Sequence, residues 1–169
     1  MARYETTVTS RRPAAETFTY LAVFSNAAIW DPGVLAAEQL DPGPVGPGTR
    51  FRLTVPFLGR PMPLTYRITS YDHGRRVVLT ATSRLLRATD TIAVSGGADG
   101  SAVSYEAEVR LRGPLQILDP LLRPGFRAVA ERAAAGLARA LSDDPAPTEP
   151  PEGQPVPPRR ATTRCTEAP

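Results

Sequence analysis

A carboxyl group that could serve in acid–base chemistry stands within an apolar stretch of the sequence. Asp90 shares the alternation of Ile92 and Val94, so in a strand these three side chains would point to the same, inward face. A buried carboxylate needs a partner, which Arg67 or Arg84 could supply. The alternative is a carboxylate at a sheet edge, paired with an arginine to set strand register. The inward interpretation makes Asp90 a candidate for general acid–base work.

Hydroxyl groups on other alternating segments could polarise a carbonyl or orient a bound molecule. The residues concerned are Tyr66, Thr80 and Tyr105. Of all these polar side chains, Tyr66 and Asp90 are the candidate catalytic residues. The pattern leaves open which of the four face inward. It also leaves open whether they would catalyse a reaction or only orient a ligand.

Several catalytic classes are excluded by residues that the chain lacks. All 20 positive charges are arginines, which removes Schiff-base lysines, Ser-Lys dyads and the lysine of Walker-type phosphate loops. One histidine and one cysteine can form neither a His/Cys zinc cluster nor an intramolecular disulfide. The histidine, His73, lies in an Asp-His-Gly turn before two arginines, which favours an exposed turn residue over a catalytic base. We therefore expect neither a metal nor a cofactor.

Glu106 and Glu108 form the one pair of carboxylates at strand spacing. Both fall on the face opposite the apolar side chains of their strand, so we expect them to be solvated charges. The apolar face of that strand comprises Val103, Tyr105, Ala107 and Val109.

The charge balance gives no sign of a nucleic-acid partner. Residues 1–141 hold 17 arginines and 12 acidic residues, a net charge of +5. These arginines are spaced out and are not interleaved with aromatic residues, as a nucleic-acid platform requires. We expect them to lie scattered over solvent-exposed faces.

Nothing in the sequence predicts export or a membrane span. The N-terminal segment is charged and has no apolar run, which favours a cytoplasmic protein. The longest uncharged stretch, residues 17–30, is too short and too polar to cross a bilayer.

The elements that must position the candidate residues can be predicted from periodicity. Alternation of period two predicts seven strands, with a hairpin loop at residues 96–101. Pro13 and the spacing of Phe18 and Leu21 predict a short helix after the first strand, and a second short helical turn ends at Asp31. The expected strands are residues 2–10, 34–40, 50–55, 64–69, 77–83, 87–95 and 102–110.

Residues 115–141 carry apolar side chains every three or four positions, which predicts one long amphipathic helix. Pro120 and Pro124 predict a broken or kinked start, with regular helix from Phe126 onward. Residues 142–169 hold eight prolines and one larger aliphatic residue, Val156. We therefore expect a domain over residues 1–141 and a disordered Pro-rich tail over residues 142–169.

An antiparallel sheet followed by one long helix is an α+β arrangement. Its segments resemble the START-like or SRPBCC superfamily, whose bacterial members include polyketide cyclase/dehydrase and lipid-transport proteins. Together they cover residues 3–141 in the family's order. The matching segments are FTYLA (18–22), WDPGV (30–34), GPGTRF (46–51), YRITSYD (66–72), DGSAVSY (99–105) and LDPLL (118–122).

The resemblance implies a helix-grip fold, in which a curved sheet of about seven strands surrounds the C-terminal helix, with two short helices after the first strand. It further implies a cavity between sheet and helix that holds a small hydrophobic molecule. Each expected lining residue could equally be plain core, although Trp30 would lie near the mouth. The expected ligand-binding residues are Phe24, Trp30, Phe51, Leu53, Leu64, Tyr66, Leu122, Phe126, Val129 and Ala133.

Three functions are compatible with this resemblance. The first is a carrier of a lipid, polyketide or similar molecule, which requires a void above ~150 Å³. The second is a polyketide cyclase, aromatase or dehydrase that works in the same cavity by proximity and electrostatic stabilisation. The third is a protein-interaction or chaperone-assisting module that docks through the Pro-rich tail. The sequence leaves the ligand, the presence of chemistry and the oligomeric state open.

Overall fold

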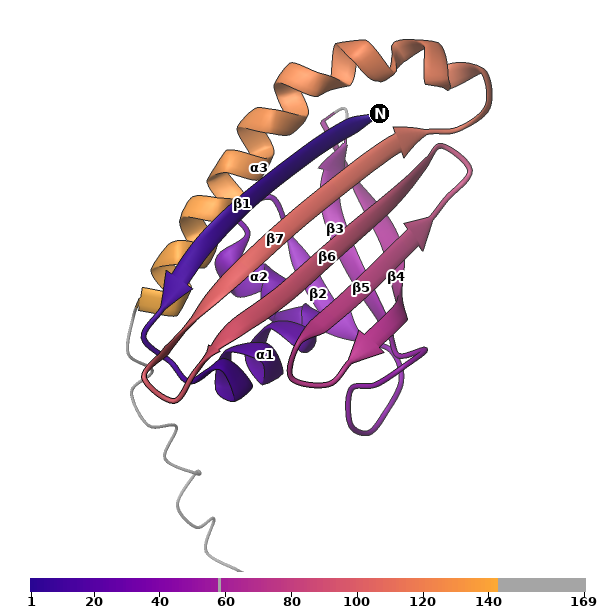
Figure 1. The fold of residues 1–169 in the computed structure, drawn as a ribbon. Helices are drawn as coiled ribbons and strands as arrows, with labels where there is room; N and C mark the ends of the chain where they lie inside the picture. The colour runs from indigo at the N-terminus through magenta and orange to yellow at the C-terminus, as the bar shows by residue number, and fades with distance from the viewer. Residues whose placement is uncertain (58, 143–169) are drawn as a thin grey trace, which may run out of the picture.

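In the part of the chain that the structure describes, seven strands form one antiparallel sheet in the order β1-β7-β6-β5-β4-β3-β2. The computed structural model describes residues 1–57 and 59–142, apart from the side chains of residues 115, 116 and 118–124. Figure 1 shows the sheet curving around α2 and the inner side of α3. The strands are β1 (Ala2–Ser10), β2 (Ala36–Gln39), β3 (Arg50–Phe57), β4 (Arg60–Asp72), β5 (Arg76–Thr82), β6 (Leu86–Gly97) and β7 (Gly100–Leu111).

Helices occupy the two connections predicted for them. After β1 come α1 (Ala14–Ala22), a 3-10 turn over Phe24–Asn26, and the single turn α2 (Ala27–Trp30). After β7 come a 3-10 turn over Gly113–Leu118 and the long helix α3 (Asp119–Ser142). The expected α+β helix-grip architecture is confirmed. The expected tail lies outside the described residues from residue 143 onward, and so does the docking role assigned to it.

Regular helix begins earlier in α3 than the prolines predict. The helix starts at Asp119 rather than at Phe126. Pro120 falls in the first turn, where backbone N–H groups have no intrahelical partner, so its missing donor carries no penalty. Pro124 lies at the sixth position, and nothing in the described residues explains why the helix continues through it.

Strand β4 also begins earlier than expected, at Arg60 rather than Leu64. Its pairing with β3 runs from Phe57↔Arg60 onward, whereas its pairing with β5 reaches only Tyr66↔Ala81. The start of β4 is thus paired along one edge only. Prolines are tolerated at such an edge because no neighbour requires their missing N–H.

Helix α3 lies along β1 and reaches α2 at one close contact (Figure 1). A Cβ atom at Gly136 would overlap the backbone carbonyl of Trp30, so only glycine allows this approach. Near the C-terminal end of the helix, the Ser10 hydroxyl donates a hydrogen bond to the Leu141 carbonyl at 3.2 Å. These contacts fix the height of α3 above the inner face of the sheet.

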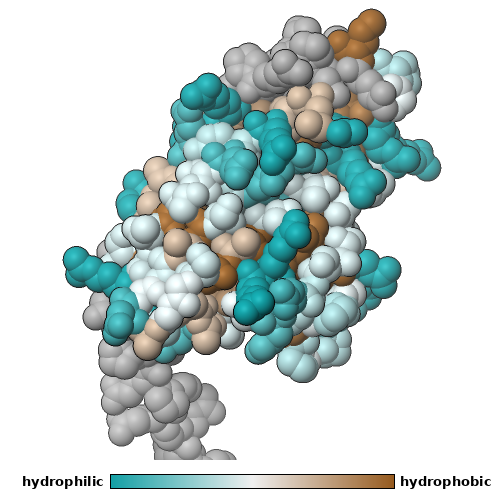
Figure 2. Space-filling model, viewed as in Figure 1, coloured by the Kyte–Doolittle hydropathy of each residue, from teal (hydrophilic) through white to brown (hydrophobic). Residues whose placement is uncertain are grey.

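The outer face of the sheet is mainly hydrophilic, with scattered apolar side chains (Figure 2). Glu106 and Glu108 belong to this face, where the Arg3 guanidinium lies 2.7 Å from one and 3.9 Å from the other. The inner face carries the core, so the alternation predicted for β7 is confirmed. No helix in the described part of the chain is long and apolar enough to cross a membrane.

Candidate functional site

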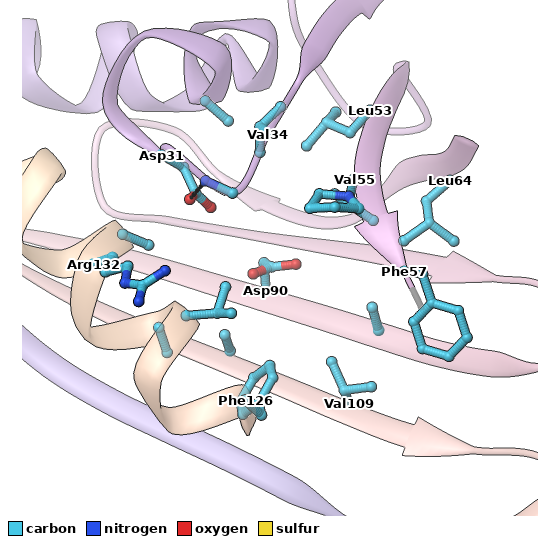
Figure 3. Close-up of a pocket in the computed structure, with 18 of the residues that line it drawn as sticks. Asp31, Val34, Leu53, Val55, Phe57, Leu64, Asp90, Val109, Phe126 and Arg132 are labelled. Atoms are coloured by element: carbon cyan, nitrogen blue, oxygen red, sulfur yellow. Dashed lines mark hydrogen bonds between the residues drawn. The ribbon is translucent and has the colours of Figure 1, made fainter. Parts of the chain in front are cut away.

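A cavity of about 600 Å³ lies between the inner face of the sheet, the α2 region and α3 (Figure 3). This is well above ~150 Å³ and within the range of small-molecule sites. Its lining is mostly apolar and comes from β3, β4, β6, β7 and the residues that follow α2. Half-exposed Val129 of α3 borders it, as do partly buried Phe57 and Met62 of the β3–β4 hairpin.

The cavity exists because small side chains stand where a filled core would need large ones. Ala2, Ala88 and Ala107 lie on its floor, contributed by β1, β6 and β7. Val109 pairs with both Ala2 and Ala88, so three small or medium side chains stand in one row across the sheet. On the opposite side, α3 lines the cavity with two further alanines, at positions 130 and 133, whose methyl groups are too short to fill the space.

Most residues expected to bind a ligand do line this cavity. They are Phe24, Trp30, Leu53, Leu64, Tyr66, Phe126, Val129 and Ala133. Phe51 lies outside the lining: it is fully buried and its ring packs edge-on against Phe24, with ring centroids 6.3 Å apart. The side chain of Leu122 lies outside the described residues.

Several lining residues were missed by the sequence pattern. Val55, Phe57 and Met62 border the cavity because β3 and β4 continue their alternation up to the hairpin, where prolines conceal it. Asp31 also borders the cavity, whereas the sequence pattern predicts only that it ends α2. The signal in the sequence for its place beside the cavity is that it directly follows Trp30, an aromatic residue that faces inward.

Asp90 lies in the floor of the cavity and is bonded to tyrosine rather than to arginine. Its side chain on β6 is buried, and the Tyr105 hydroxyl of β7 donates a hydrogen bond to Oδ1 at 2.6 Å. Tyr66 of β4 also forms a hydrogen bond with this carboxyl. Asp90 pairs with Ala107 in the ladder, which makes Tyr105 its diagonal neighbour on the same face.

The arginines expected to pair with Asp90 lie elsewhere, so that expectation is wrong. Arg67 follows the inward-facing Tyr66 and therefore points outward, where it donates a hydrogen bond to the Gly48 carbonyl at 3.3 Å. Arg84 is exposed in the turn between β5 and β6. Thr80 also faces away from the cavity, with its hydroxyl 3.5 Å from that of Thr69.

Burial sets the protonation behaviour of this cluster. Loss of solvent raises the pKa of Asp90 to about 6, against the hydrogen bonds from Tyr105 and Tyr66, which lower it. The negative charge of Asp31 raises it further. Burial and the nearby Asp90 charge raise the pKa of Tyr66 and of Tyr105 well above the usual value, so both remain hydroxyl donors.

A second carboxyl group borders the cavity at the end of α2. Asp31 accepts a hydrogen bond from the backbone N–H of Gly33 at 2.7 Å, and partial burial raises its pKa. The preceding Trp30 packs edge-on against Tyr105, with ring centroids 5.7 Å apart. Figure 3 shows Asp31 and Arg132 on one side of the cavity, Phe57 and Val109 on the other, and Asp90 between them.

This arrangement can bind an apolar molecule and hold one polar group of it at Asp90. In its ionised form the carboxyl group can accept hydrogen bonds or a proton, and the two phenols can donate. Among the described residues, no group of three or more His, Cys, Asp or Glu side chains could hold a metal ion. His73 is exposed in its turn, with Nδ1 3.5 Å from the Tyr71 hydroxyl.

A curved antiparallel sheet that encloses an apolar cavity with its C-terminal helix defines the helix-grip class of proteins. Within that class, the chain belongs to the polyketide cyclase/dehydrase and lipid transport family, whose model matches residues 1–142. A search of curated proteins finds no match to the sequence.

Solved structures with this fold support the same architecture. A START superfamily protein from Mycobacterium smegmatis superposes with a TM-score of 0.67 at 14% identity, covering 83% of this chain and 97% of the other. The Zhui aromatase/cyclase from Streptomyces sp. R1128 gives 0.64 at 20% identity, covering 82% and 90%. A protein from Thermus thermophilus gives 0.64 at 16% identity, covering 83% and 95%. At these identities the likeness shows the fold alone.

Proposed function

We propose that the protein binds a small hydrophobic molecule in the cavity between the sheet and α3. The observation that carries this proposal is an apolar cavity of about 600 Å³ with a buried, hydrogen-bonded carboxyl cluster in its floor. Natural ligand sites combine an apolar lining with a few placed polar groups in the same way. Membership of a family named for cyclases and lipid transport agrees with it.

Trp30 provides the test, because it is the single tryptophan of the chain and it lines the cavity. Trp30 is only 3% exposed, so 1-decanol in the cavity should change the indole emission through contact with the ring, and the change should saturate at one decanol per protein. The same titration of urea-unfolded protein is the control. Emission that does not change, or that changes linearly without saturation, would contradict binding at this cavity.

The Asp90 cluster favours one further candidate, a cyclase or dehydrase of polyketide-like substrates. An ionised Asp90 could take a proton from the carbon next to a ketone. Once Asp90 is protonated, the Tyr66 and Tyr105 hydroxyls that donated to its carboxylate could turn to the developing enolate oxygen and donate to it instead. The enolate carbon would then form the ring bond to a second carbonyl carbon of the same molecule, whose C=O π bond breaks and whose oxygen receives the proton held by Asp90, which restores the ionised carboxylate.

This candidate is tested by separating turnover from binding. Asp90→Asn should abolish cyclisation of a linear poly-ketone while leaving its affinity within about threefold. Cyclisation by this variant at the native rate would exclude Asp90 as the base and leave the carrier function as the account of the cavity.

A further inference from the structure

We infer that the cavity selects hydrophobic molecules whose polar group is a hydrogen-bond donor without negative charge, such as an alcohol, phenol or amine, and rejects the matching carboxylic acids. This inference rests on the proposed function and names the class of ligand. Its basis is the charge and the hydrogen-bonding capacity of the groups that line the cavity.

The charged lining is predominantly acidic. Among the described residues, Asp31, Asp90, Glu108 and Arg132 are the lining residues that carry charge at neutral pH, and Glu108 directs its side chain to the outer face of the sheet. Glu108 is offset by Arg3, 3.9 Å away on the outer face. Arg132 is exposed on α3, where solvent screens its charge. The remaining negative charges, Asp90 and Asp31, are buried and partly buried, so they act on a ligand with less screening.

The two acidic groups act on the same part of the cavity. The charge of Asp31 influences the ionisation of Asp90, Tyr66 and Tyr105, so its field extends over the whole polar cluster. A ligand carboxylate placed there would meet two like charges in an apolar setting, which is strongly unfavourable. An uncharged or cationic head group would not.

Asp90 retains capacity for a ligand donor. A carboxylate offers about four lone-pair positions on its two oxygens. Tyr105 occupies one position on Oδ1, and Tyr66 supplies one more hydrogen bond. Since both tyrosines donate to Asp90, the acceptor positions left over suit a hydroxyl or ammonium donor from the ligand.

The cavity also has an apolar end that fits the rest of such a molecule. Val55, Phe57 and Met62 of the β3–β4 hairpin and Phe126 of α3 line it, and all four are partly buried. Figure 3 shows Phe57 on the side of the cavity away from Asp31 and Arg132. The buried Asp90 therefore receives the head group, and the chain of the ligand extends towards the partly exposed hairpin end.

Displacement of N-phenyl-1-naphthylamine, an uncharged fluorescent probe, tests this selection on the full chain at pH 7.5. Three competitors differ only in the head group: 1-decanol, decylamine and decanoic acid. We expect decanol and decylamine to displace the probe at concentrations at least tenfold lower than decanoic acid does. The double variant Asp31→Asn with Asp90→Asn should reduce this difference at least fivefold, and the nearly isosteric amides preserve shape.

Arg132→Gln is the matched control, because it removes a lining charge of the opposite sign. It should leave the preference for decanol intact or increase it. Decanoic acid that displaces the probe as well as decanol does would overturn the inference while leaving ligand binding in place. The proposed function, and the inference with it, would be overturned if the probe does not bind and none of the three competitors gives a response in the Trp30 titration.

Discussion

Asp90 is held between two hydroxyl donors at a depth where its ionisation depends on what surrounds it. Tyr105 and Tyr66 favour the charged form, and burial favours the neutral one. Burial prevails, so this carboxyl group titrates near pH 6 instead of near pH 4. A ligand that donates a hydrogen bond would shift this balance back towards the charged form.

The dependence of stability on pH follows from this shift. The pKa of Asp90 is about 6 in the folded protein, against 3.8 for a solvated aspartate such as that of the unfolded chain. Between these values the folded state binds more protons than the unfolded state, so Asp90 lowers stability as pH rises through that window. The full loss, reached above about pH 7, is on the order of 3 kcal/mol.

Asp90→Asn should remove this contribution. Chemical denaturation measures the unfolding free energy of both proteins at each pH. We expect the value for the variant to rise relative to that of the native protein from pH 4 to pH 7. Comparing the two proteins at each pH cancels the carboxyl groups that do not interact with Asp90. Asp31, whose raised pKa has the same sign, is coupled to Asp90, and its change in the variant adds to the measured difference. A difference that stays constant over this range would contradict a buried, titrating Asp90.

Removing the Tyr105 hydroxyl should raise the pKa of Asp90 further, because the donor at 2.6 Å stabilises the charged form. Carboxyl ¹³C NMR titration of Tyr105→Phe measures this directly. Tyr71→Phe is the control, since the Tyr71 hydroxyl lies beside His73, on a turn outside the cavity lining. An unchanged or lower pKa in Tyr105→Phe would show that the hydrogen bond does not act as described.

At the scale of elements, the position of α3 depends on the close approach of Gly136 to the Trp30 carbonyl. We expect Gly136→Ala to destabilise the protein by about 2–4 kcal/mol, because a methyl group there forces α3 away from α2. Gly125→Ala is the matched control on the same helix, where a Cβ meets nothing within 4 Å. It should be neutral or stabilising by up to about 1 kcal/mol. Equal stability of the two variants in thermal unfolding would contradict this account of the contact.

The strands with one solvent-exposed face were largely predictable from the sequence. Alternation placed β1 at its observed bounds and located β5, β6 and β7 to within about two residues. It failed at the start of β4 because Pro61 and Pro63 are typical of turns, and only the single-sided pairing with β3 makes them acceptable. At the start of α3 it failed at Pro120, because a first-turn proline carries no penalty, whereas the passage of the helix through Pro124 has no explanation in the described residues.

The candidate site was predictable in part. The inward direction of Asp90 follows from its parity with Ile92, and the structure places it there. The same parity argument applied to Arg67 would have directed that side chain outward, next to an inward Tyr66. The partnership of Asp90 with Tyr105 was not predictable, because it depends on which residues stand diagonally across β6 and β7.

At the scale of the whole molecule, the cavity is a consequence of small residues meeting on two surfaces. Alanines on the sheet face alanines on α3, and Gly136 fixes how closely that helix can approach. In the sequence these alanines are indistinguishable from ordinary core positions. The volume left between them depends on the placement of α3, which no spacing along the chain determines.

The central claim is that a hydrophobic molecule binds in this cavity. Its most direct test is to measure how tightly two variants bind N-phenyl-1-naphthylamine. Ala88→Leu adds atoms to the cavity floor, and Ala93→Leu makes the same change on the outer face of the same strand. We predict at least tenfold weaker binding by folded Ala88→Leu and native affinity for Ala93→Leu. Native affinity in folded Ala88→Leu would contradict the claim and place the binding site elsewhere on the molecule.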